Sequence, residues 1–281
     1  MTILVIGAKG MLGKDLVPIL STEHKVVGMG HEEIDIRDEE AVKGVFQRLQ
    51  PNLVINAAAY TEVDESEFQP EKAYSVNAEG ARHVAEACAM IHARLFHLST
   101  DYVFDGLSPR PYREEDPPNP MNVYGATKLK GEKLIREILN ESLIIRTAWL
   151  YGHHGRNFVK AILGQAAQKK EIRVVNDQRG SPTFTQDLSR AILHLIPTAA
   201  KGIVHVTNSG SCSWFEFAQE ILTEKGIGEV VVVPISSEEL KRPARRPANS
   251  VLDCSLYKSL TGQTMRSWKE GLRDYIHLSK Q

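Results

Sequence analysis

The chain has 281 residues, enough for one large α/β domain or for a main domain with a smaller lobe. Its 42% hydrophobic and 25% charged residues are ordinary for a globular enzyme, and a formal net charge of −1 argues against nucleic acid or an anionic membrane surface as a partner. The three cysteines are far apart and lack the spacing of a zinc site, so they fit free thiols in a reducing compartment.

Membrane insertion and secretion are not expected. No apolar run approaches the ~18–20 residues of a membrane span. The N-terminal apolar run is short and follows no basic segment, so it reads as a buried strand rather than a signal. We therefore expect a cytoplasmic protein without a membrane partner.

The first half of the chain alternates strand-like and helix-like segments. We expect strands at residues 2–6, 25–29, 53–56, 94–99 and 142–147. We expect helices at residues 11–20, from a cap at Asp38 to about Leu49, at 71–91 and at 123–139. This alternation predicts an α/β fold with a Rossmann-type doubly wound parallel sheet, which binds ligands at the carboxyl ends of its strands.

The second half is less regular. A proline-rich loop is expected at residues 107–120, because proline interrupts both helix and sheet. Helices are expected at 157–168 and 185–195, and after the capping boxes Ser213–Glu216 and Ser267–Glu270, whereas 242–249 reads as a loop. We predict a Rossmann domain at residues 1–150, and at 151–281 a smaller, mainly substrate-binding lobe with segments that return to the sheet.

Glycines follow the first strand at the spacing G-x-x-G-x-x-G. They are Gly7, Gly10 and Gly13, and they open the helix at 11–20. Glycine lets the backbone approach a pyrophosphate, and the helix N-terminus offers free N–H groups and a positive dipole end. We predict that this turn binds a dinucleotide; a merely structural turn is the alternative.

The choice of dinucleotide depends on the end of the second strand. Residues 28–31 include no acid to bind a ribose 2′-hydroxyl, and Glu32 and Glu33 come too late. Lys9 can face a 2′-phosphate, so we expect NADPH, with NADH tolerated. Asp35 and Ile36 are predicted to lie beside the adenine.

Small residues end the third strand. Ala57, Ala58 and Ala59 follow Asn56, and their size would let the backbone run close to the cofactor. Core packing explains alanines equally well.

Tyr124 and Lys128 form a Y-x-x-x-K pair on the helix at 123–139. Positions i and i+4 share a helical face, so the ammonium can lie beside the phenol and the cofactor ribose. A nearby cation lowers the pKa of a phenol from about 10, which would let Tyr124 pass a proton near neutral pH. We therefore predict that Tyr124 and Lys128 are catalytic and contact the cofactor.

A hydroxyl stands upstream of the tyrosine. The strand predicted at 94–99 ends at Ser99, and Thr100 and Asp101 follow it. There Thr100 can hold a substrate carbonyl oxygen together with Tyr124. The alternative is a hydroxyl that bonds only the backbone. Glycine turn, hydroxyl and Y-x-x-x-K occur in the order that a reductase site requires.

Taken together, these residues make the sequence similar to the extended short-chain dehydrogenase/reductase family over nearly the whole chain, and within it to the dTDP-4-dehydrorhamnose reductases. The strings that carry the resemblance are GAKGMLG at 7–13, NAAAYTEVD at 56–64, VN at 76–77, STDYVFDG at 99–106, YGATKLKGE at 124–132, RTAWLYG at 146–152, GSPT at 180–183 and RPANS at 246–250. The STDYVFDG and RTAWLYG strings and the arginine-proline tail are the more specific ones.

The resemblance implies an activity. Hydride would pass from the nicotinamide to C4 of dTDP-4-dehydro-L-rhamnose, Tyr124 would protonate the C4 oxygen, and dTDP-L-rhamnose would form. It implies substrate contacts at Thr100, Asp101, Val103 and Trp149, and cofactor contacts at Gly10, Met11, Leu12, Ala59, Tyr60, Thr61 and Asn77. Arg246 is predicted to pair with the diphosphate, because a guanidinium fork suits phosphate.

Other readings stay open. Family members can form homodimers bridged by magnesium; Asp15 and Glu270 are the candidate acids here, and surface salt bridges explain them equally well. Dehydratases of the superfamily place a further acid after the aspartate, whereas this chain has Tyr102, which favours simple reduction. The alternatives are a nucleotide-sugar epimerase, another 4-ketosugar reductase, or a non-catalytic regulatory subunit.

Overall fold

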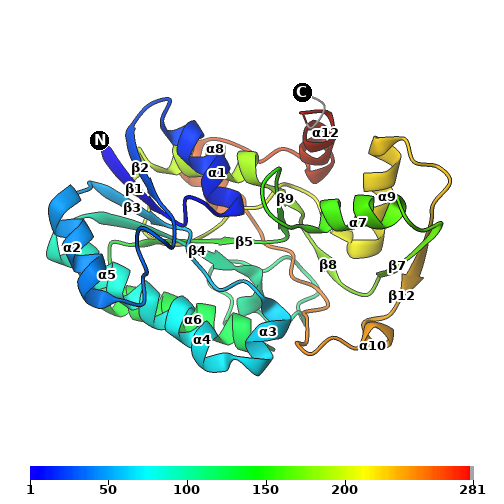
Figure 1. The fold of residues 1–281 in the computed structure, drawn as a ribbon, viewed down its shortest axis with the longest axis horizontal. Coiled ribbons are helices and arrows are strands. Elements are labelled where there is room, and N and C mark those ends of the chain that lie inside the picture. Colours follow the sequence, from blue (N-terminus) through cyan, green and yellow to red (C-terminus); the bar gives the residue numbers. More distant parts are fainter. Residues whose placement is uncertain (279–281) are drawn as a thin grey trace.

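A parallel sheet, built mainly from strands of the first half of the chain, organises the larger part of the molecule (Figure 1). The computed structural model describes residues 1–278. Across the sheet the strands run β10 (Gly202–His205), β5 (Leu143–Thr147), β4 (Arg94–Thr100), β3 (Leu53–Asn56), β1 (Thr2–Ile6) and β2 (Lys25–Met29). Every neighbouring pair is parallel. The chain passes from β1 to β2 on one side and then back past β1 to β3 on the other side, so the direction of winding reverses between β1 and β3, where a doubly wound sheet binds its ligand.

Helices cover both faces of this sheet. One face packs against α1 (Met11–Leu20), α8 (Thr185–Leu195) and α11 (Ser255–Thr261), and the other against α2 (Glu39–Leu49), α5 (Gly80–Met90) and α6 (Val123–Ile138). The strands between the two layers are apolar on both sides; Ile3, Leu4 and Val5 of β1 have no exposed surface. The predicted α/β doubly wound fold is therefore confirmed.

The predicted helix at 71–91 is interrupted. It begins with α4 (Pro70–Tyr74), continues as a π-helical turn at Ser75–Glu79 and resumes as α5. A single α-helix was therefore the wrong expectation. Just upstream lies α3 (Val63–Phe68), and the short 3₁₀ turn η2 (Asp101–Val103) follows β4.

The later part of the chain has an apolar core of its own. This core joins α7 (Phe158–Ala166), α9 (Trp214–Lys225) and α12 (Trp268–Leu278) to the parallel pair β7 (Glu171–Val175) and β12 (Val231–Ile235). The remaining elements are β6 (Leu150–Tyr151), β8 (Arg179–Gly180), β9 (Thr183–Phe184), β11 (Cys212–Ser213) and α10 (Ser237–Leu240). The capping box predicted at Ser213 and Glu216 opens α9. Among residues 1–278, no helix has the length and apolar character that crossing a membrane requires.

Candidate active site

Two adjoining cavities lie at the carboxyl ends of the central strands. The first, of 360 Å³, extends from the glycine turn to α6 and Trp149, and the second, of 410 Å³, extends from the same turn to the loop after β2. Both are lined by Gly7, Gly10, Ala57 and Ala59. A ligand of dinucleotide length can therefore lie across the end of β1, at the switch point of the sheet.

The glycine turn is shaped by its missing side chains. Gly7 has φ +81°, and a Cβ there would lie 2.8 Å from the backbone carbon of Ala57. A Cβ on Gly13 would lie 2.3 Å from the carbonyl oxygen of Gly7. Gly10 precedes α1 and no side chain caps this helix, so the first N–H groups of α1 stay available to an anion. The turn therefore fits the pyrophosphate of a dinucleotide.

Most of the predicted site residues line these cavities. In the first cavity they are Gly7, Gly10, Met11, Leu12, Gly13, Ala57, Ala59, Thr61, Thr100, Asp101, Tyr124, Lys128 and Trp149. The second adds Lys9, Asp35, Ile36, Ala58 and Tyr60.

Basic and acidic side chains alternate at the end of the second cavity. Lys9 Nζ lies 2.5 Å from Glu33 and 3.0 Å from Glu32, and Arg37 lies 2.6 Å from Asp35. Glu32 and Glu33 therefore reach Lys9, although the sequence placed them too late to matter. Sequence reasoning also missed three basic residues of the lining, which are His31, Arg37 and Lys72. For His31 and Arg37, the position soon after β2 was the available signal, whereas Lys72 lies in α4 and has no such signal.

The first turn of α6 holds the predicted catalytic tyrosine. Asn122 caps this helix through its side-chain oxygen, which accepts a 2.8 Å hydrogen bond from the Gly125 amide. A Cβ on Gly125 would lie 2.1 Å from the carbonyl oxygen of Tyr102, so the glycine lets the helix start against the turn after β4. That contact brings Tyr124 to the same cavity as Thr100.

Burial controls the ionisation of Tyr124. It raises the pKa of the phenol to about 12; a hydrogen bond with Thr100 opposes the rise and the Asp101 carboxylate adds to it. The expectation that a neighbouring cation leaves this pKa below its ordinary value is therefore wrong for this structure, because desolvation is the largest effect and Lys128 is not among the groups that shift the phenol. Asp101 is itself buried, and its pKa is raised to about 6.

Lys128 is buried at the back of the same cavity. Its Nζ donates a 2.6 Å hydrogen bond to the Leu98 carbonyl and lies 3.3 Å from His97 Nε2. Burial lowers the pKa of the ammonium to about 8, against an opposing effect of Glu132. Burial and the charge of Lys128 lower the pKa of His97 well below its ordinary value, so the imidazole is neutral.

Trp149 forms the far wall of the first cavity. Its backbone has φ +47°, and its ring stacks on Trp214 at a centroid distance of 3.4 Å and an angle of 4°. Thr147, Ala148 and Leu150, which sequence reasoning missed, line the cavity beside it. Their position at the end of β5 was the available signal.

Three predicted residues lie outside both linings. Asn77 is buried; its amide accepts from the Tyr60 N–H at 2.8 Å and donates to the Tyr60 carbonyl at 3.1 Å. Val103 has no exposed surface and packs with Phe104 in a small apolar cluster, so its side chain is core. Arg246 makes two hydrogen bonds to Asp64, at 2.6 and 2.8 Å. Its predicted contact with a diphosphate stays a prediction.

The two acids considered for magnesium have other partners. Asp15 is buried and accepts a 2.5 Å hydrogen bond from Thr185, and Glu270 accepts from Ser267 at the start of α12. Within the described residues, no group of three or more His, Cys, Asp or Glu side chains is arranged to hold a metal.

Comparisons with known proteins show which proteins the chain resembles. The spore coat polysaccharide biosynthesis protein SpsK of Bacillus subtilis (strain 168) is 43% identical over 98% of this chain and 96% of its own. A dTDP-4-dehydrorhamnose reductase of Streptomyces griseus is 43% identical over 96% of this chain and 91% of its own. The crystal structure of dTDP-4-dehydrorhamnose reductase from Bacillus anthracis str. Ames, in complex with NADP, superposes with a TM-score of 0.95, at 42% identity and 99% coverage of both chains.

The profile of one protein family covers nearly all of the sequence. It is described as RmlD substrate binding domain, and it matches residues 1–280. The chain therefore belongs to the RmlD substrate binding domain family.

Proposed function

We propose that this chain is an NADPH-dependent reductase that converts the C4 ketone of dTDP-4-dehydro-L-rhamnose to the alcohol of dTDP-L-rhamnose. The main support is one cavity that holds Thr100, Tyr124 and Lys128 beside a glycine turn able to take a pyrophosphate. Relatives at 43% identity include a dTDP-4-dehydrorhamnose reductase, and the likeness extends along almost the full chain.

The nicotinamide cofactor, when bound, supplies the hydride. Tyr124 donates the proton to the C4 oxygen, and its raised pKa keeps the phenol protonated at neutral pH, which is the form a proton donor needs. Thr100 holds the same oxygen from the end of β4. Lys128 holds the ribose of the cofactor, and Asp101 and Trp149 contact the sugar.

We propose NADPH as the preferred cofactor, with NADH accepted. Lys9, His31, Arg37 and Lys72 surround the end of the second cavity and would attract a 2′-phosphate. Glu32 and Glu33 are paired with Lys9, and Asp35 is paired with Arg37. Residues from 151 onwards would mainly bind the sugar nucleotide.

The test is NADPH oxidation with a panel of nucleotide 4-ketosugars, followed by product analysis. Reduction of dTDP-4-dehydro-L-rhamnose to dTDP-L-rhamnose supports the proposal, whereas a C4 epimer formed without net oxidation would indicate an epimerase. No turnover of any 4-ketosugar by folded protein that binds NADPH would favour the regulatory-subunit alternative.

Tyr124→Phe tests the proton donor. We expect turnover to fall by a factor of about 10²–10⁴, the contribution typical of a positioned general acid, while NADPH still binds. Phenylalanine keeps the ring that contacts Tyr102 edge-on at 5.7 Å, so the fold should survive. Tyr112→Phe, which removes a hydroxyl bonded to Asp105 away from the cavity, is the matched control. Equal turnover in wild type and Tyr124→Phe would remove the phenol from the mechanism.

A further inference from the structure

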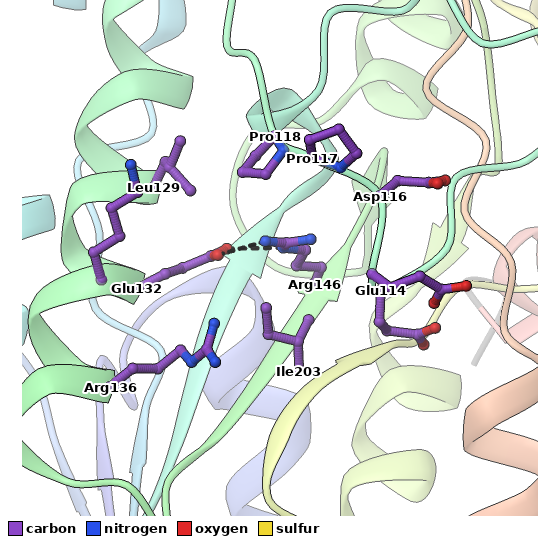
Figure 2. A pocket seen from close by; sticks show the side chains of 11 residues that line it. Glu114, Asp116, Pro117, Pro118, Leu129, Glu132, Arg136, Arg146 and Ile203 are labelled. Carbon is purple, nitrogen blue, oxygen red and sulfur yellow. Dashed lines mark hydrogen bonds and ion pairs between the residues drawn. The ribbon is translucent and has the colours of Figure 1, made fainter.

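A buried ion pair lies between α6, the helix that carries Tyr124 and Lys128, and the central sheet (Figure 2). Arg146 of β5 binds Glu132 of α6 through two hydrogen bonds, Nη2 to Oε2 at 2.7 Å and Nε to Oε1 at 3.0 Å. Each side chain is only 2% exposed. The pair faces a separate cavity of 510 Å³, which lies between this helix and the proline-rich loop.

The same carboxylate reaches the candidate active site. Ser99 donates a 2.5 Å hydrogen bond to Glu132 Oε1, and Ser99 lines the cavity that holds Tyr124 and Lys128. Ser99 and Arg146 are register partners on β4 and β5. Glu132 therefore ties two strand ends to one helix, beside the residue that precedes Thr100.

Spacing places Glu132 on the catalytic face of α6. Tyr124, Lys128 and Glu132 follow one another at intervals of four residues, so they form one row along the helix. Lys128 has no carboxylate within salt-bridge distance among the described residues; its near neighbours are a carbonyl and a neutral imidazole. Glu132, one turn further along this row, is the carboxylate whose charge raises the pKa of Lys128 against the effect of burial.

A gain in folding stability does not readily explain why this position holds a buried ion pair. A buried pair loses hydration of both ions, and well-packed apolar side chains of the same volume are often as stable or more so. We infer that Glu132, clamped by Arg146 and Ser99, is a positioning residue for the reduction: it provides the counter-charge of the buried Lys128 ammonium and fixes the catalytic helix against the sheet. This inference rests on the proposed function.

The charged and titratable groups around Lys128 determine the direction in which its pKa should move when Glu132 loses its charge. On α6 they are Tyr124 and Glu132, on β4 His97, at the end of β4 Asp101, and on β5 Arg146. Burial lowers the pKa of Lys128 and Glu132 opposes that effect. Loss of the Glu132 charge must therefore lower this pKa further, and activity that needs the ammonium must then be lost at lower pH.

Glu132→Gln is the test, because it removes the charge and keeps the shape. We expect the alkaline limb of the kcat profile to move to lower pH by about one unit, the lower end of the effect of an adjacent opposite charge. The NMR titration of isotope-labelled lysine side chains, with the signal assigned through Lys128→Arg, should show the same shift directly. Glu132→Asp, which keeps the charge, should restore the limb.

Two further variants separate this role from lost stability. Asp187→Asn on α8 breaks the ion pair of another buried carboxylate, with the partly exposed Arg266, and should destabilise the fold without moving the limb. If Glu132→Gln does not fold, Glu132→Gln/Arg146→Met avoids an unpaired buried cation and should shift the limb in the same direction.

The outcomes are distinguishable. An active wild type whose alkaline limb and lysine titration are unchanged in the glutamine variant overturns the inference and leaves the reductase in place. A wild type that reduces no 4-ketosugar overturns the proposed function, while the lysine titration still reports whether Glu132 is the counter-charge.

Discussion

The phenol of Tyr124 and the ammonium of Lys128 respond to burial in opposite ways. Desolvation favours the neutral form of each group, so it raises the pKa of the tyrosine to about 12 and lowers that of the lysine to about 8. The tyrosine therefore keeps its proton over the whole range in which the lysine titrates. On the alkaline side, the pH dependence of the reaction should report the lysine.

Arg37 allows a residue-scale test of cofactor choice. Its guanidinium lines the second cavity and is held by Asp35. We expect Arg37→Ala to raise the KM for NADPH by roughly tenfold, since a charge-assisted hydrogen bond contributes about 1.5–3 kcal/mol, and to change the KM for NADH little. Steady-state kinetics with both cofactors measure this.

The control for Arg37→Ala is Lys43→Ala on α2. Lys43 is a cation paired with Glu39 and Glu40 and lies outside both cavity linings. A loss of affinity that is equal for NADPH and NADH in Arg37→Ala would assign the residue to the adenine or the fold rather than to a 2′-phosphate.

At the scale of elements, α6 lies unusually close to its neighbours. A Cβ on Gly131 would lie 2.2 Å from the carbonyl oxygen of Asn77, which belongs to the π-helical turn at Ser75–Glu79. Asn77 in turn bonds both Tyr60 and Thr127. The π-helical turn thus joins α6 to a segment that lines the second cavity.

Gly131→Ala should disrupt this contact. The methyl group would meet a backbone atom, so we expect a loss of unfolding free energy of about 1–3 kcal/mol, as for other overpacked sites, together with lower kcat. Gly164→Ala on α7 is the matched control: its Cβ would meet nothing within 4 Å, so it should stabilise by roughly 0.5–1 kcal/mol. Urea unfolding measures the free energy of unfolding of both variants. If Gly131→Ala and Gly164→Ala are equally stable, α6 does not pack closely against the π-helical turn.

Local patterns in the sequence predicted much of the site. The glycine turn, the hydroxyl at the end of β4 and the Y-x-x-x-K pair each depend on a few adjacent residues, and the structure brings all three to one cavity. The interrupted helix was missed, because a π-helical turn alters hydrogen bonding without a clear change in periodicity. The direction of the Tyr124 pKa was missed because burial cannot be read from spacing.

Contacts between distant segments appear only at the scale of the whole molecule. Arg246 and Asp64 are 182 residues apart in the chain, and no local pattern pairs them. Trp149 likewise stacks on Trp214, which opens a helix of the later part of the chain. The wall of the first cavity therefore depends on how the two parts of the chain meet.

Trp214→Ala should loosen that wall. Trp149 has a left-handed backbone, which costs about 1–2 kcal/mol. Its stack on Trp214 offsets part of this, since aromatic pairs contribute about 0.5–1.5 kcal/mol. We expect a KM for the sugar nucleotide raised by up to about tenfold and loss of the tryptophan circular dichroism of the stacked pair. Trp268→Phe, the control, removes the tryptophan that lies outside the stack and should keep the wild-type KM and circular dichroism. If Trp214→Ala also keeps the wild-type KM and circular dichroism, Trp149 holds its position without the stack.

The edge strand β10 has a consequence for how the molecule is made. It pairs with β5 through residues 202–205, which follow α7, β7 and α8 in the chain and precede α9, β12 and α12. During synthesis on the ribosome, β5 therefore remains an unpaired edge strand of the first half of the chain until some sixty further residues have emerged past it. A fragment that ends near residue 150 would keep β5 as an unpaired edge strand, so it should aggregate rather than fold alone.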